Sequence, residues 1–143
     1  MKSNQNEVSD QAKLQLQGIS HYGLNVRNME RAEKFYTGVL GFPVIMRTRT
    51  NAGLQHVEVD AGNVAIALFE SPELDLTAAQ KTMTEDGYLH FAFAGDYARF
   101  DEILKSLKDS GVAMDGEPRD WGNGVSVYFR DPDGHQLEIH FDK

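Results

Sequence analysis

The chain of 143 residues contains no cysteine. It can therefore form no disulfide, no thiolate metal site and no cysteine nucleophile, so any metal ion must be held by histidine and carboxylate side chains. Positive charge is also scarce, because 14 Lys and Arg stand against 22 Asp and Glu and give a net charge of -8. This balance argues against nucleic acid as a partner, since nucleic-acid binding requires a basic surface.

Long apolar runs are missing as well. No segment approaches the roughly 20 apolar residues that span a bilayer, and no signal-peptide core follows the N-terminus. We therefore expect a cytoplasmic protein that binds no membrane. Residues 1–15 are polar and lack periodicity, which predicts a frayed leader, and residues 16–143 are long enough for a single domain with its own core.

The most informative stretch is residues 124–141, which predict two strands joined by a tight turn at residues 131–134 (DPDG). Apolar and polar side chains alternate on both sides of the turn, as in a strand with one buried face. The polar face of this hairpin gathers Tyr128, Glu138 and His140. Taken alone, that face fits a solvated strand as well as it fits the wall of a polar cavity.

Hydrophobic periodicity predicts the element order βαβββ twice. The first module covers about residues 18–70, with Asn28 as the N-cap of its helix, and the second covers about 88–141, with Asp96 as the N-cap. A polar linker over residues 71–87 separates them. The sequence therefore predicts an α+β fold of paired βαβββ modules, which form a curved, cup-like mixed sheet with the helices on the outside.

The repeat places His21 and His90 at corresponding positions in the first strand of each module. Because side chains alternate along a strand, His21, His90 and Glu138 all point away from the apolar faces of their strands. Each alone is more often a surface residue, but the repeat would place their strands side by side. The apolar residues predicted to pack on the helices are Tyr22, Leu24, Val26, Leu89, Phe91, Phe93, Leu137, Ile139 and Phe141.

Two imidazoles and one carboxylate on a shared face form a facial triad that leaves several metal positions open for substrate and water. This set suits Fe2+ or Mn2+, and Zn2+, Ni2+ or Co2+ also fit. His140 lies on the face of Glu138, where it either supports the site or is a rim histidine. His56 shares a strand face with Glu58, as a rim residue of the cavity or a solvated one.

Three segments carry a family resemblance: residues 19–42 (ISHYGLNVRNMERAEKFYTGVLGF), 88–93 (YLHFAF) and 126–140 (SVYFRDPDGHQLEIH). They resemble the vicinal oxygen chelate superfamily of glyoxalase I, fosfomycin-resistance proteins, extradiol dioxygenases and bleomycin-resistance proteins. The resemblance runs from about residue 18 to 141. It implies metal ligands at His21, His90 and Glu138.

Two further positions separate the branches of this superfamily. Glyoxalase I takes a fourth ligand, a Glu, where this chain has Ala65 and Ala67, which argues against that branch. Tyr128, ten residues before Glu138, is similar to a tyrosine of extradiol dioxygenases and fosfomycin-resistance enzymes. The resemblance implies that Tyr128 is catalytic, donating a hydrogen bond to a bound oxygen or acting as acid and base.

Neither of those two branches matches completely. Fosfomycin thiol transferases resemble this chain but carry a Thr where Gly23 stands, and an Arg in a C-terminal tail. Extradiol enzymes carry an acid/base His at the spacing of Arg119, so His56 or His140 would have to replace it.

The resemblance implies a metal-dependent enzyme that acts on a small substrate through adjacent oxygens, with ring-cleaving, extradiol-type dioxygenation as the first choice. The alternatives are a glyoxalase-like lyase or isomerase, a fosfomycin-resistance-type epoxide-opening enzyme, and a metal-free sequestering protein of the bleomycin-resistance type. A homodimer is expected, and the cavity closes either within one chain or across the dimer. The residues expected to contact substrate are Arg119, Trp121, Asn123, His56 and His140.

Overall fold

The computed structural model describes residues 14–75 and 90–143 of the chain. The predicted leader, apart from its last residues, and most of the predicted linker lie outside these ranges. None of the helices in the described ranges is long and apolar enough to cross a membrane.

The first module is a four-stranded sheet with one helical segment, in the predicted order. Its strands lie in the order β1-β4-β3-β2, with β1 parallel to β4 and the other neighbours antiparallel. The predicted helix over residues 29–40 is an α-helix that continues as a π-helical turn. The elements are β1 (His21–Val26), α2 (Met29–Lys34), η1 (Phe35–Val39), β2 (Val44–Arg49), β3 (Gln55–Asp60) and β4 (Ala65–Glu70).

The second module repeats this plan, with β5 parallel to β9 and the sheet order β5-β9-β8-β6. Two of its strands, β6 and β7, are only two residues long, and both pair with β8. The elements are β5 (His90–Asp96), η3 (Tyr97–Arg99), α3 (Phe100–Asp109), β6 (Ala113–Met114), β7 (Arg119–Asp120), β8 (Gly124–Arg130) and β9 (Gln136–Asp142).

Both predicted helix caps are confirmed. The Asn28 side chain accepts a hydrogen bond from the main-chain N–H of Arg31 at 2.9 Å, and Asp96 accepts one from Ala98 at 3.0 Å. Each bond satisfies one of the N–H groups that the first helical turn leaves without a partner.

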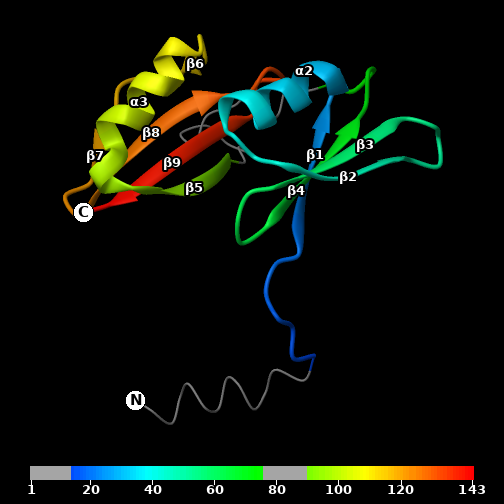
Figure 1. Ribbon diagram of the computed structural model, residues 1–143, viewed down its shortest axis with the longest axis horizontal. Helices are drawn as coiled ribbons and strands as arrows, with labels where there is room; N and C mark the ends of the chain where they lie inside the picture. Colours follow the sequence, from blue (N-terminus) through cyan, green and yellow to red (C-terminus); the bar gives the residue numbers. More distant parts are fainter. Residues whose placement is uncertain (1–13, 76–89) are drawn as a thin grey trace.

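The two modules lie side by side, and Figure 1 shows α2 and α3 on the same, upper side of the two sheets. Each sheet buries its apolar face against this helical side. The predicted α+β class with paired modules is therefore confirmed. The largest fully buried side chains are Tyr36, Phe129, Phe141, Met29, Ile66, Leu68 and Leu137.

Tyr22 departs from the predicted packing against the helix. It is 39% exposed, and its ring meets Phe91 of β5 edge-on at 4.4 Å between centroids. Phe42 and Phe93 form a second aromatic contact between the modules, at 5.3 Å. Because β1 and β5 are edge strands of their sheets, their outermost aromatic residues pack against the neighbouring module instead of the helix of their own.

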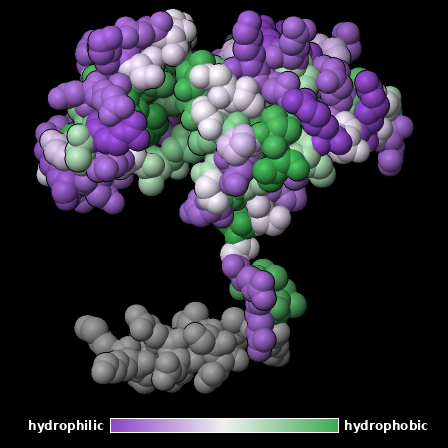
Figure 2. All heavy atoms as spheres, viewed as in Figure 1, coloured by the Kyte–Doolittle hydropathy of each residue, from purple (hydrophilic) through white to green (hydrophobic). Residues whose placement is uncertain are grey.

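The segment before β1 leaves the body of the protein, as Figure 2 shows. Leu14 and Leu16 are both 81% exposed there, and Ile19 is 61% exposed. Within residues 14–75 and 90–143 of one chain, these three apolar side chains find no core to pack against.

The turn between β8 and β9 docks on the first module. The Tyr36 hydroxyl, on η1, donates a 2.7 Å hydrogen bond to Asp131 Oδ2, and both side chains are buried. Asp133 Oδ1 accepts from the Arg31 guanidinium at 2.9 Å and from the main-chain N–H of Arg27 at 3.0 Å. Each of these two buried carboxylates of the second module thus accepts hydrogen bonds from the first through one oxygen, which fixes how the modules sit together. The other oxygen of Asp133, Oδ2, is buried without a partner among the described residues.

His135 belongs to this contact as well. His135 Nε2 lies 2.8 Å from the main-chain oxygen of Asn25, at the end of β1. The tight turn therefore serves as the junction between the modules, a role that turn chemistry alone does not indicate.

Burial shifts both partners of the central hydrogen bond. Desolvation raises the pKa of Asp131, and desolvation together with the Asp131 carboxylate raises the pKa of Tyr36 well above its ordinary value of 10.0. The unfolded chain thus releases the Tyr36 proton near its ordinary value while the folded chain keeps it. The free energy of unfolding must therefore fall as the pH rises above that value.

We expect Tyr36→Phe to lower the free energy of unfolding at pH 7 by about 1 to 3 kcal/mol, because Asp131 loses a buried donor. The variant should also lose less stability than wild type between pH 9 and about pH 11, since the Tyr36 ionisation is gone. Urea denaturation across this pH range measures both effects. Tyr97→Phe, at an exposed tyrosine, is the matched control; equal pH slopes for all three proteins would contradict the prediction.

Candidate metal and substrate site

Each sheet has an open face, turned away from its helix. On the first sheet, the strand register aligns Gly23 of β1 with Ala67 of β4 and Glu58 of β3. His21 pairs with Ala65 in the adjoining row. Small residues therefore form the floor of this face between His21 and the polar side chains of β3.

On the second sheet, His90 and Glu138 converge. His90 Nε2 lies 3.1 Å from Glu138 Oε1, and Glu138 is only 7% exposed. Two ligand atoms at about 2.1 Å from one ion and at right angles around it stand about 3.0 Å apart. The spacing therefore fits two neighbouring ligands of one metal ion, and the donor types suit a divalent ion.

The second oxygen of Glu138 is held by a residue that the sequence did not single out. Ser126 Oγ donates to Glu138 Oε2 at 2.6 Å and lies 2.8 Å from His140 Nδ1. The sequence could have indicated Ser126, because it is two residues before Tyr128 and so projects from the same face of the strand. His140, predicted as a substrate contact, thus lies beside Glu138 through this hydroxyl, and its Nε2 lies 3.1 Å from Asp142 Oδ1.

Tyr128 is buried on β8, directly opposite Glu138 in the antiparallel register. The predicted catalytic tyrosine and the predicted ligand are therefore cross-strand neighbours, whose side chains project from the same face.

The predicted substrate loop before β8 is tied to the same cluster. Trp121 Nε1 donates to Ser126 Oγ at 3.1 Å, and the Arg119 guanidinium lies 5.0 Å from the centre of the Trp121 ring. The main-chain oxygen of Asn123 accepts from Lys143 at 3.1 Å. The loop thus brings one cation and one indole to the edge of the open face, while Asn123 contributes a main-chain contact.

Lys143 makes a second contact with this loop, through its ammonium group 2.9 Å from Asp120 Oδ2. This hydrogen bond lowers the pKa of Asp120 and raises that of Lys143. The last residue of the chain therefore holds the loop next to β9.

His56 lies on the open face of the first sheet. Its ring stacks on Phe69 at 4.0 Å, and its Nε2 is 3.9 Å from Glu58 Oε1, beyond hydrogen-bonding distance. That nitrogen is buried and has no hydrogen-bond partner among the described residues. A role of His56 in substrate binding stays a prediction.

His21 is exposed on β1, with Nδ1 3.0 Å from Ser20 Oγ. It belongs to the first sheet, whereas His90 and Glu138 belong to the second. Within one chain, no three His, Asp or Glu side chains of residues 14–75 and 90–143 gather closely enough to hold a metal ion. A single chain thus supplies one pair of predicted ligands and, separately, a third.

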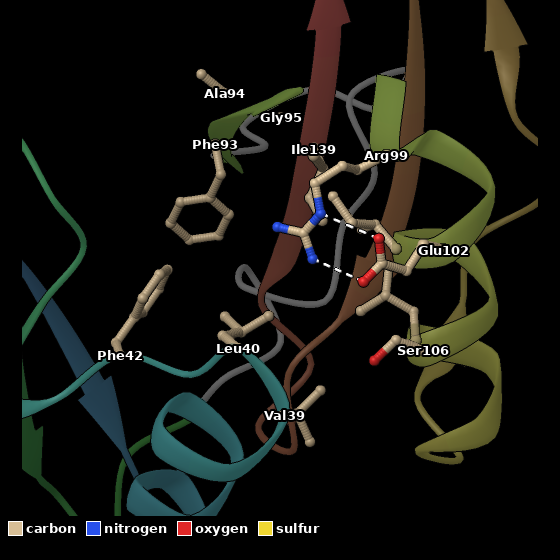
Figure 3. A pocket seen from close by; sticks show the side chains of 12 residues that line it. Val39, Leu40, Phe42, Phe93, Ala94, Gly95, Arg99, Glu102, Ser106 and Ile139 are labelled. Atoms are coloured by element: carbon tan, nitrogen blue, oxygen red, sulfur yellow. Dashed lines mark hydrogen bonds and ion pairs between the residues drawn. The ribbon is translucent and has the colours of Figure 1, made fainter. Parts of the chain in front are cut away.

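A cavity of about 300 Å³ lies elsewhere, between the two modules (Figure 3). Its walls are mainly apolar, with Phe42 of the first module facing Phe93 of the second, and an Arg99–Glu102 ion pair at the side. Ile139, which also lines it, alternates with Glu138 and His140 along β9. The cavity is therefore on the opposite face of the sheet from the predicted ligands, and none of the predicted site residues lines it.

Residues 18–139 match the family model described as the Glyoxalase/Bleomycin resistance protein/Dioxygenase superfamily. Metallothiol transferase FosB of Shouchella clausii (strain KSM-K16) is 31% identical over 126 residues, covering 86% of this chain and 79% of that protein. FosB of Staphylococcus haemolyticus is 29% identical over 126 residues, covering 87% and 84%. The crystal structure of fosfomycin resistance protein FosX from Listeria monocytogenes is 26% identical, with a TM-score of 0.72 over 90% of this chain and 95% of that chain.

We expect His90→Ala to lower the affinity of the protein for Mn2+ by about 100-fold or more, because it removes one of two converging ligands. Isothermal titration of the metal-free protein measures this. His135→Gln is the matched control, since His135 bonds the main chain of β1 instead of facing Glu138. Unchanged Mn2+ binding by folded His90→Ala would remove His90 from the site.

Proposed function

Because the chain belongs to the Glyoxalase/Bleomycin resistance protein/Dioxygenase superfamily, we propose that it is a metal-dependent enzyme that opens an epoxide in a small substrate by adding a thiol or water. The observation that carries the proposal is the pairing of His90 Nε2 with Glu138 Oε1 at 3.1 Å beside the buried Tyr128. Further support comes from similarity to metallothiol transferases and a fosfomycin resistance protein.

This proposal replaces the order of preference that the sequence suggested. The relatives named above favour the epoxide-opening alternative over ring-cleaving dioxygenation. The chain also has Arg119 at the spacing where extradiol enzymes carry their acid/base histidine. A glyoxalase-type site is disfavoured because Ala65 and Ala67 offer no fourth carboxylate ligand.

The metal site would use His90 and Glu138 of one chain and His21 of a second copy. Two features of the single chain support a second copy. His21 lies on the first sheet while His90 and Glu138 lie on the second, and the described residues form no three-ligand group. The exposed apolar side chains of Leu14 and Leu16 also favour association. A homodimer with two equivalent sites satisfies all three ligands, since twofold symmetry supplies each contact twice.

A divalent ion bound there would act as a Lewis acid toward the substrate oxygens; the ligand types favour Mn2+ or Fe2+. The chain's own residues supply the rest. The nucleophile, a thiol or water that has given up its proton, would form a bond to a ring carbon, and the ring C–O bond would break. The released oxygen would then take up a proton, which balances the one that the nucleophile lost. Tyr128 is placed on the face of Glu138 to donate a hydrogen bond to the oxygen that is released.

Arg119 and Trp121 would border the substrate. The Arg119 guanidinium, near the Trp121 ring, suits an anionic group on the substrate, since a planar cation pairs with carboxylate or phosphonate oxygens. On the other sheet, Gly23 and Ala67 are small residues on the open face, beside the Phe69 ring.

Mixing two inactive variants tests whether the site forms between chains. His21→Ala and His90→Ala should each weaken Mn2+ binding by about 100-fold or more, whereas a refolded equimolar mixture should recover about one quarter of the wild-type high-affinity sites, because half the dimers carry one intact site of two. Calorimetric titration with Mn2+ measures the recovery. A mixture that recovers nothing, from proteins that are folded and dimeric, would place all three ligands within one chain. His21→Ala that binds Mn2+ as wild type does would remove His21 from the set.

The reaction itself is tested with fosfomycin and Mn2+, in the presence and absence of a small thiol such as cysteine. We expect a new phosphorus resonance from the opened epoxide, lost in Glu138→Gln because the site loses its carboxylate ligand. Oxygen consumption with catechols should stay at the background rate. Oxygen uptake with a catechol and no change in fosfomycin, from protein that binds metal, would restore the dioxygenase interpretation.

A further inference from the structure

Ser126 occupies a central place beside the proposed ligands. It lies on β8 and is 0% exposed. Its hydroxyl oxygen is 2.6 Å from Glu138 Oε2, 2.8 Å from His140 Nδ1 and 3.1 Å from Trp121 Nε1. One small side chain therefore connects β9 twice with the loop that precedes β8.

Counting hydrogens fixes the direction of the bonds to Glu138 and Trp121. A hydroxyl has one hydrogen and two lone pairs, an indole N–H only donates, and an ionised carboxylate only accepts. The Ser126 hydrogen must therefore go to Glu138, and one lone pair accepts from the Trp121 N–H. The direction of the contact with His140 Nδ1 depends on the tautomer of that ring, whose Nε2 also lies 3.1 Å from Asp142 Oδ1. The hydroxyl oxygen thus bonds both the carboxylate and the indole.

This arrangement leaves the two carboxylate oxygens of Glu138 with different roles. Oε2 is held by the shorter hydrogen bond, at 2.6 Å, while Oε1 faces His90 Nε2. A carboxylate held through one oxygen has lost rotational freedom before any ligand arrives, which favours binding through the other oxygen.

We propose that Ser126 is a positioning residue, which orients Glu138 for a divalent ion beside His90 and couples the Trp121 loop to that carboxylate. The inference rests on the proposed metal centre. It assigns to Trp121 a second role besides contact with substrate. The Trp121 indole and the Glu138 carboxylate share the Ser126 hydroxyl, so the environment of the indole should change when Glu138 binds an ion.

A merely structural role for Ser126 is the competing explanation. Such a role would lower the stability of the fold when the hydroxyl is removed, because Glu138 Oε2 would be left without a donor. It would not alter metal affinity in protein that remains folded, and it would not connect metal binding to the environment of Trp121. These two readouts therefore separate positioning from packing.

The chain offers a built-in probe, because Trp121 is its only tryptophan. Mn2+ is titrated into full-length, metal-free protein, and binding is followed both by calorimetry and by tryptophan emission. For wild type, we expect stoichiometric binding together with a change in emission. For Ser126→Ala, we expect about 10- to 100-fold weaker Mn2+ binding, the effect typical of removing a partner that orients a ligand, and no emission change at saturation.

Further variants protect the test against loss of folding. Ser126→Cys keeps nearly the same volume with a much weaker donor and should also weaken binding, whereas Ser126→Thr keeps the hydroxyl and should restore both signals. Ser110→Ala is the matched control, because its hydroxyl bonds to a main-chain oxygen of α3, on an element that carries none of the proposed ligands.

Folded Ser126→Ala or Ser126→Cys that binds Mn2+ with wild-type affinity would overturn the positioning role while leaving the metal centre intact. Wild-type protein that binds no divalent ion would overturn the proposed metal centre, and the role of Ser126 with it. Weaker binding that Ser126→Thr restores, with Ser110→Ala unchanged, would support the proposal.

Discussion

Two buried carboxylates in one tight turn hold the halves of this protein together. Asp131 and Asp133 belong to the second module, but their oxygens accept hydrogen bonds from Tyr36, Arg31 and the main chain of the first. Burying a carboxylate is costly unless it gains hydrogen bonds, and Asp131 Oδ2 and Asp133 Oδ1 gain theirs from the first module, so the docked module stabilises this position of the turn. The relative placement of the two sheets follows from that requirement.

Docking in this way sets both helices on one side of the molecule (Figure 1) and leaves both open faces on the other. His21 then lies on the open face of the first sheet, and His90 and Glu138 lie on the open face of the second. The same contacts that stabilise the chain thus divide the predicted ligand set between two sheets. If a second copy completes the set, as we propose, stability of the protomer and assembly of the site are linked, because the junction decides where each face points.

Within the second sheet, the chemistry depends on small distances between strands. Glu138 shares a sheet face with Tyr128, and Ser126 holds the carboxylate oxygen that does not face His90. The loop that carries Trp121 reaches the same hydroxyl. The apolar cavity between the modules plays no part in this cluster (Figure 3), since it lies on the helical face of β9. Polar convergence, and not cavity size, identifies the candidate site.

The sequence by itself determined the repeated βαβββ order, both helix caps and the face on which His21, His90 and Glu138 lie, because each depends on local periodicity or a local hydrogen bond. Only the tertiary structure decided which strands belong to the same sheet and which polar groups meet across it. Strand parity indicates that two side chains point in the same direction, but not that their strands belong to one sheet. The separation of His21 from His90 could therefore not be predicted from parity. The sequence also did not predict the module junction at residues 131–135 or the hydrogen bonds of the Ser126 hydroxyl. In both cases the partners of the polar groups come from residues distant in sequence.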